Sequence, residues 1–145
     1  MYRFPVYSLV DEGSAPELQA LLKSEGWPVR HLSTAGARDT GSFLLSVAES
    51  LRCPPPSSWS ALADTMAASV LSYAAVPERK VAVMWWGAGD LAGISLRTFI
   101  GAFDVFVDVA RQAYLDDMDV ALFMFGSGPS FLPLGAVLDD AGCDA

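Results

Sequence analysis

A single carboxylate stands among small side chains in the stretch SSWSALADTM, residues 57–66. Apolar residues recur at i, i+3, i+4 and i+7 from Trp59 to Met66, which predicts a helix with one apolar face. At about 100° per residue, Asp64 lies about 140° from Trp59, almost opposite that face. A carboxylate presented in this way suits insertion into the pocket of a protein partner.

The residues around Asp64 are small and uncharged, where a solvated helix face would normally carry Lys and Glu. Depletion of long charged side chains is typical of the centre of a protein interface. On the pattern alone, an alanine-rich helix with one solubilising acid is the favoured interpretation. The residues that would form a flat contact surface beside Asp64 are Ser57, Ser58, Ser60, Ala61, Ala67 and Ala68.

Two further acids, Asp104 and Asp108, lie four residues apart on the exposed side of a helix predicted from Leu96 to Tyr114. Like charges at this spacing cost about 0.2–0.5 kcal/mol, which the nearby Arg111 can offset. Taken alone, these acids favour a solvated helix face. The alternative is a second acidic contact for a basic partner.

A glycine-rich segment, GAGDLAG at residues 87–93, follows a predicted strand and matches the glycine fingerprint of dinucleotide-binding folds. That fingerprint requires a helix to open inside it and a second strand to end in an acid about 20 residues later. Asp104 and Asp108 lie within a predicted helix instead. A flexible strand-to-helix loop is therefore favoured over a phosphate cradle.

Other reactive residue types favour structural roles. His31, the single histidine, has no nearby cysteine or Ser-His-Asp spacing, so a surface or structural role is favoured over a general base. Turn and helix-exit roles are favoured over a cation site for the acids Asp116, Asp117 and Asp119. We therefore expect no catalytic residue, no metal site and no cofactor.

The composition of the 145 residues predicts one folded domain, since 52% are hydrophobic. No apolar run reaches the roughly 18 residues of a membrane span, and the start of the chain shows no signal peptide. A cytoplasmic location is therefore expected. Cys53 and Cys143 make neither a disulfide framework nor a zinc set. We expect Cys53 to be a small buried hydrophobe and Cys143 to lie in a terminal tail.

The net charge of −8 limits the class of partner. Nucleic acids and anionic membranes would repel such a chain, so neither is expected as a partner. A basic protein would be attracted, and the field would accelerate the encounter.

The predicted elements alternate between strands and helices. An N-terminal strand at residues 2–6 is placed at a sheet edge because Pro5 lacks a backbone donor. A capping box, Ser14–Glu17, opens the first helix, which stops at Gly26. Further strands are predicted at 27–32, 81–86 and 119–125, helices from about Thr40, from Ser57 or Ser58 and from Leu96, and a tail after Gly126. This alternation predicts right-handed crossovers and a small parallel sheet, that is, an α/β fold.

Five segments in order resemble the barstar family, small acidic cytoplasmic protein inhibitors of secreted microbial ribonucleases. The resemblance covers roughly residues 27–126. The segments are FLLSVAESL, SWSALADTM, VAVMWW, DVFVDVA and DVALFMF. It implies a three-stranded parallel sheet packed with helices, to which residues 1–26 would add an N-terminal strand–helix extension and residues 127–145 a C-terminal tail, all in one barstar-like domain.

The resemblance also implies roles for individual residues. Asp64 takes the position of the family's key aspartate, which occupies the phosphate site of the ribonuclease, and Asp108 takes the position of its supporting acid. The sequence departs from the family where Pro55, Pro56 and Ser57 replace an aromatic-and-glycine loop. It also departs at the helix, where Ser58, Ser60 and Ser69 replace an asparagine, an acid and a tryptophan.

These observations predict an intracellular bacterial inhibitor, a monomer that binds a basic, guanyl-specific ribonuclease 1:1 through RNA mimicry. Asp64 would mimic the phosphate, and Asp108 and Asp104 would contact basic groups at the rim. One alternative is a nucleotide-binding enzyme that uses the loop at 87–93. Another is an immunity protein or antitoxin for a different toxin. A homo-oligomeric scaffold is a further alternative, suggested by Val105 and Val109 away from the buried side of their helix.

Overall fold

A sheet of four parallel strands forms the centre of the molecule, in the order β1-β4-β3-β2. The computed structural model describes residues 4–73 and 76–143. The strands are β1 (Tyr7–Asp11), β2 (Val29–Ser33), β3 (Lys80–Trp86) and β4 (Asp119–Gly126). The predicted α/β class with a parallel sheet is thereby confirmed. The N-terminal strand lies at an edge as expected, and its Tyr7 is in register with Leu122 of β4.

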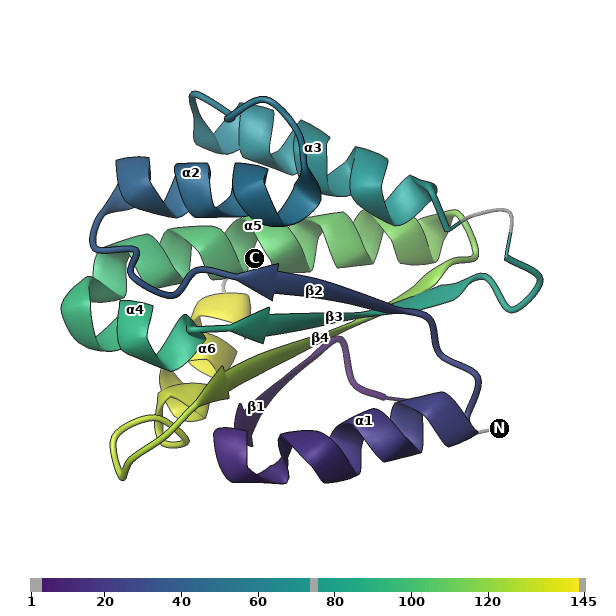
Figure 1. The fold of residues 1–145 in the computed structure, drawn as a ribbon, viewed down its shortest axis with the longest axis horizontal. Coiled ribbons are helices and arrows are strands. Elements are labelled where there is room, and N and C mark those ends of the chain that lie inside the picture. Colours follow the sequence, from purple (N-terminus) through teal and green to yellow (C-terminus); the bar gives the residue numbers. More distant parts are fainter. Residues whose placement is uncertain (1–3, 74–75, 144–145) are drawn as a thin grey trace.

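Helices lie on both faces of this sheet (Figure 1). They are α1 (Ala15–Ser24), which a 3-10 turn η1 (Glu12–Ser14) precedes, α2 (Thr40–Leu51), α3 (Trp59–Leu71), α4 (Ala88–Ile94), α5 (Leu96–Leu115) and α6 (Leu134–Cys143). Helix α1 packs on one face, while α2, α3 and α5 pack on the other. In the described part of the chain, no helix has both the length and the apolar character needed to cross a membrane.

Strand β3 is apolar on both sides because each face of the sheet is covered. The fully buried Trp85 points to the side of α2 and α5, where its ring meets Phe43 and Phe106. The half-buried Trp86 points to the opposite side and stacks on Phe125 with ring centroids 4.4 Å apart. The two tryptophans therefore face opposite sides of the strand, as the alternation predicts.

Helix α2 begins where the sequence predicts, and its expected inward residues Phe43, Leu44, Val47, Ala48 and Leu51 are buried. Asp39 caps it, since the carboxylate accepts from the Ser42 N–H at 2.8 Å and from Ser42 Oγ at 2.9 Å. Ser42 Oγ in turn accepts a hydrogen bond from the Asp39 N–H at 3.1 Å. These hydrogen bonds from Ser42 stabilise the charged carboxylate and hold the pKa of Asp39 below its ordinary value of 3.8.

The lowered pKa of Asp39 predicts a loss of stability in acid. Because the folded-state pKa lies below that of the unfolded chain, the stabilisation is present above the unfolded pKa of 3.8 and is lost as the pH falls through the folded value. We expect the wild-type protein to lose more stability between about pH 5 and about pH 2 than Asp39→Asn, which keeps a capping oxygen without the charge. Urea unfolding midpoints of both proteins, measured across this pH range, test this prediction. An equal loss of stability in the two proteins would contradict it.

The N-terminal strand and the cap of the first helix lie at other residues than predicted. The strand begins at Tyr7 instead of covering residues 2–6, and Tyr2 lies outside the described residues. Ser14 is already helical and its side chain makes no capping hydrogen bond, so the predicted capping box is wrong. The cap lies three residues earlier, where Asp11 accepts from the Gly13 N–H and starts the turn η1. Gly26 ends the first helix as expected, with φ of +74°.

The segment after Gly126, expected to be a tail, contains the helix α6. The glycines and prolines that precede this helix favoured the prediction of an irregular tail. Phe131 is buried with its ring against Gly126, where a side-chain Cβ would come within 2.5 Å of that ring. The Tyr7 hydroxyl also contacts the Asp139 carboxylate, which joins β1 to α6. The side chain of Cys143 lies outside the described residues. Cys53 is half-buried against the core instead of fully buried.

Helix α5 runs one residue beyond its predicted end, and the burial of several of its side chains differs from the prediction. Tyr114, predicted to face inward, is 58% exposed near the end of the helix. Val109, predicted to lie off the buried side, is buried, and Val105 is partly buried against the core. Helix α3 packs along α5 and takes up the apolar surface that suggested a homo-oligomer.

Candidate functional site

Helix α3 presents Asp64 to solvent by burying its opposite face. The prolines at 54–56 prevent an earlier start, and Ser58 caps the helix by accepting from the Ala61 N–H at 3.1 Å. Leu62 and Met66 are buried in the core, as is Val70 one turn later. Asp64 is exposed, in agreement with the prediction.

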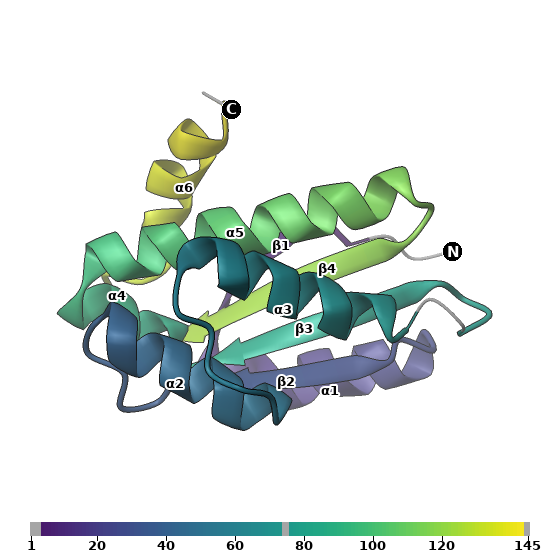
Figure 2. The same ribbon diagram turned by 90° about the horizontal axis from the view of Figure 1, so that it is seen from above.

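Helix α5 runs beside α3 in the same direction, on the same face of the sheet (Figure 2). Gly101 permits this approach, since a Cβ there would lie only 2.9 Å from Cζ2 of the Trp59 ring. The Trp59 ring is in turn packed against Phe43 of α2. The start of α3 is therefore held between α2 and α5, which determines where Asp64 lies along α5.

Asp64 and Asp108 line one shared groove between these helices, which we call the α3–α5 groove. Its volume is about 240 Å³. The lining residues are Ala63, Asp64, Ala67, Val70 and Leu71 of α3, Asp108, Val109, Gln112 and Ala113 of α5, and Asp116 just after it. Three carboxylates and no lysine or arginine are present in this set. The groove therefore combines an apolar floor with negative charge.

Both predicted carboxylates are free to meet a partner. Within the part of the chain that the structure describes, neither the Asp64 nor the Asp108 side chain makes a hydrogen bond or an ion pair. Arg111, the expected neighbour of Asp108, lines a different hollow beside β1. The negative charge of the groove is thus compensated by no cation among its own lining residues.

The other predicted contact residues are divided by the fold. Ala67 joins Asp64 in the groove, whereas the exposed Ala68, one turn after Asp64, lines a hollow on the other flank of α3. Asp104 is exposed one turn before Asp108 and does not line the groove. Near the start of α3, Ser57, Ser58 and Ser60 are exposed and Ala61 is half-buried.

Leu71, Gln112 and Asp116 also line this groove, although they were not predicted as site residues. The spacing of Asp108, Gln112 and Asp116 at i, i+4 and i+8 places them on one helix face and would have indicated a polar stripe. Leu71, which is 56% exposed, follows Asp64 by two turns on its face. Leu71 is the last residue of α3, and helical periodicity does not reveal where a helix ends.

The glycine-rich segment at 87–93 is helical, so the predicted flexible loop is wrong. It forms the short helix α4 after Gly87, whose φ is +85°. A Cβ at Gly87 would come within 2.9 Å of the Ala35 nitrogen, and one at Gly89 within 2.6 Å of the Gly126 Cα. Close packing of backbone on backbone accounts for these two glycines.

The remaining candidates have structural roles. Trp86 donates its indole N–H to His31 Nδ1 at 3.0 Å, and the histidine is exposed on the edge strand β2. Asp116 and Asp117 end α5, and their carbonyl oxygens accept hydrogen bonds from the Arg79 side chain. Across residues 4–73 and 76–143, no group of three or more His, Cys, Asp or Glu side chains is placed to hold a metal ion.

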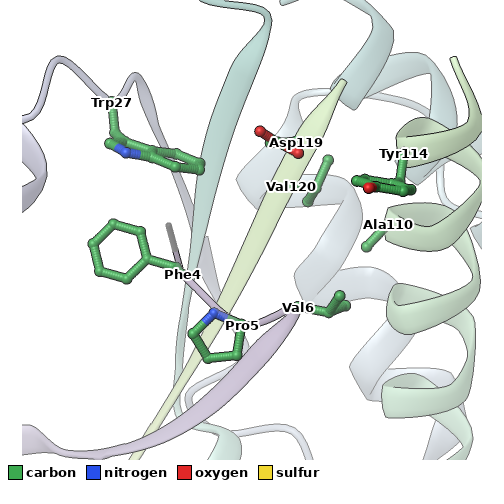
Figure 3. Close-up of a pocket in the computed structure, with 8 residues that line it drawn as sticks. All are labelled: Phe4, Pro5, Val6, Trp27, Ala110, Tyr114, Asp119 and Val120. Carbon is green, nitrogen blue, oxygen red and sulfur yellow. The ribbon is translucent and has the colours of Figure 1, made fainter. Parts of the chain in front are cut away.

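A further hollow of about 240 Å³ lies beside the segment that precedes β1 (Figure 3). Phe4 and Trp27, whose rings meet edge to face at 5.3 Å, form one side of it. Ala110 and Tyr114 of α5 form the other side. Its lining is largely apolar, with the Asp119 carboxylate as its one formal charge, so it offers less for binding chemistry than the α3–α5 groove.

Comparisons with family models, with curated proteins and with solved structures find no match to this chain. The case for a function therefore rests on the arrangement of its own side chains. The strongest arrangement is a pair of carboxylates on two helices that line one groove and have no partner among the described residues.

Proposed function

We propose that this chain inhibits a basic, guanyl-specific microbial ribonuclease by binding at its active site. A ribonuclease holds the phosphate of RNA with Arg, Lys and His side chains. A carboxylate on a rigid helix can replace that phosphate, and Asp64 has this role. Asp108, with Asp104 one turn before it, contacts basic groups at the rim. The chain itself catalyses nothing and uses no cofactor.

The observation that carries the proposal is that Asp64 and Asp108 both line the α3–α5 groove. Two carboxylates without a cation between them repel each other, and a basic partner relieves that repulsion. Both side chains are exposed, so forming a complex breaks no hydrogen bond within the described residues. The same arrangement supplies negative charge at the point where a cationic active site would dock.

Two further features support the proposal. The resemblance of residues 27–126 to the barstar family implies a ribonuclease inhibitor, with these two acids in the family's functional positions. The net charge of −8 attracts a basic enzyme over several ångströms, because charges steer encounter within about a Debye length of 8–10 Å.

The departures from the family suggest a contact that depends heavily on charge. Serine stands at position 69, where the family can carry a tryptophan, and its side chain lines the opposite flank of α3 from Asp64. Tryptophan and tyrosine anchors usually supply a large share of interface affinity. With such anchors absent from this position, the carboxylates must contribute more, and affinity should depend strongly on salt.

We expect one equivalent of this protein to abolish cleavage of RNA by a purified basic, guanyl-specific ribonuclease. The association rate should fall by about tenfold or more between low and high salt, because screening removes electrostatic steering. Activity titration with stopped-flow association measures both quantities. A neutral or acidic ribonuclease serves as the matched control and should remain active. Full activity of the basic enzyme with excess protein at micromolar concentration would contradict the proposal.

A further inference from the structure

A second polar hollow lies on the other flank of α3, between that helix, the strand β2 and the end of α2. Its volume is about 340 Å³. Arg30 of β2 and Cys53, just after α2, form one side of it, while Thr65, Ser69 and Ser72 of α3 form the other. Helix α3 thus separates this hollow from the α3–α5 groove. The hollow contains no carboxylate among its lining residues, although the chain as a whole is strongly acidic.

The guanidinium of Arg30 has no partner in the described residues. Its Nε atom is buried and makes no hydrogen bond, and no carboxylate or carbonyl accepts from the rest of the group. Arg30 is half-buried and shares its face of β2 with the fully buried Leu32, so its side chain lies on the side of the sheet that the helices cover. The buried Nε of this half-buried side chain lacks an acceptor, which is costly, and a ligand oxygen in the hollow can supply one.

Hydroxyl groups face the same space from α3. Thr65 and Ser69 make no side-chain hydrogen bond within the described residues, so both can donate to a ligand. Ser72 Oγ already donates to the Ser69 carbonyl at 2.6 Å and is left with acceptor capacity. The spacing of Thr65 and Ser69 at i and i+4 stacks their hydroxyls one turn apart on one helix face. Arg30 therefore faces two free donors across the hollow.

We propose that this hollow binds a tetrahedral oxyanion, namely a phosphate group, either inorganic or on a small phosphomonoester. The planar guanidinium provides several N–H donors in a fork that matches two phosphate oxygens. Thr65 and Ser69 donate to the remaining oxygens from the opposite wall. A volume of about 340 Å³ leaves room for the organic part of a small ester.

The acidity of the chain does not prevent this binding. Salt at physiological strength screens exposed charges beyond about 8 Å, so the immediate neighbours of the hollow determine its field. Those neighbours are one arginine, hydroxyls, a thiol and apolar groups. The inference does not depend on the proposed inhibition of a ribonuclease, since Arg30, Thr65 and Ser69 line no part of the α3–α5 groove.

Titration of the full chain with inorganic phosphate, and separately with ribose 5-phosphate, tests the site by backbone amide NMR at constant ionic strength. We expect saturable shifts at Arg30, Cys53, Thr65 and Ser69, while chloride produces none. Tighter binding of ribose 5-phosphate would identify a phosphomonoester as the ligand, and equal or weaker binding would identify phosphate itself. Absence of saturable shifts with both compounds would overturn the proposal.

Variants separate a specific site from general anion attraction. Arg30→Gln should weaken phosphate binding by about tenfold to a hundredfold, because hydrogen bonds to a charged group are lost. Ser69→Ala removes one donor with little risk to folding and should weaken binding by about tenfold. Arg97→Gln, at the exposed start of α5, removes the same charge elsewhere and should leave binding unchanged. Undiminished binding in both Arg30→Gln and Ser69→Ala would exclude this hollow as the site.

Discussion

Replacing Asp64 by alanine is expected to weaken inhibition of a basic ribonuclease by about two to three orders of magnitude. Truncating one partner of a desolvated charge pair costs about 2–5 kcal/mol, and each 1.4 kcal/mol is a factor of ten. Much of that cost comes from the arginine and lysine groups of the enzyme, which lose their counter-charge in the complex. Inhibition constants of the two proteins at one fixed salt concentration measure the effect.

One further variant at position 64 separates charge from shape, and two variants at other acids serve for comparison. Asp64→Asn keeps the size of the side chain and should lose most of the affinity, since the mimicry depends on charge. Asp108→Ala should cause a smaller loss, because a rim contact remains partly solvated. Asp90→Ala removes an equally exposed acid from α4, outside the groove, and should retain full potency. Equal potency of Asp64→Ala and the wild-type protein would exclude Asp64 as the phosphate mimic.

Gly89→Val is expected to destabilise the fold by about 3 kcal/mol or more. A Cβ at this position would lie 2.6 Å from the Gly126 Cα, and the Phe131 ring is also within 3.2 Å of it. Neither backbone can move away, because Gly126 ends a central strand and Gly89 lies inside α4. Overpacking of this kind costs about 1–3 kcal/mol even where flexible side chains can adjust. Thermal and urea unfolding measure the loss.

Gly93 provides the matched control in the same helix. A Cβ there meets nothing within 4 Å, and its backbone is helical. Gly93→Ala should therefore stabilise the protein by about 0.5–1 kcal/mol, because alanine loses less entropy in a helix. Equal stability of Gly89→Val and the wild-type protein would show that α4 does not pack on β4 in this way.

The sequence predicts most of the fold because the buried elements carry clear periodicity. Phe43 to Leu51 repeat at helical spacing, and the continuous apolar run 81–86 has the length of a central strand. The prediction of secondary structure is wrong where a segment packs against residues distant in sequence. The segment 87–93 is a helix because its glycines fit against Gly126 and Ala35, which are distant in sequence.

The candidate site was predictable in part. The exposure of Asp64 follows from the helical pattern, and so does that of Asp108. That both line one groove depends on how α3 lies along α5, which the Gly101–Trp59 contact determines. No pattern within either helix contains that information. For the same reason, no pattern in either helix predicts that Leu71 and Gln112 line this groove.

The register of Tyr7 with Leu122 has a consequence for biosynthesis. Strand β1 leaves the ribosome before the other strands of this sheet and its partner β4 leaves after them, so β1 stays unpaired until residue 126 has emerged. Closing so long a loop is entropically unfavourable, and non-local pairing of this kind slows folding. Of the three strand pairings, only that of β2 with β3 can therefore form before β4 has been synthesised.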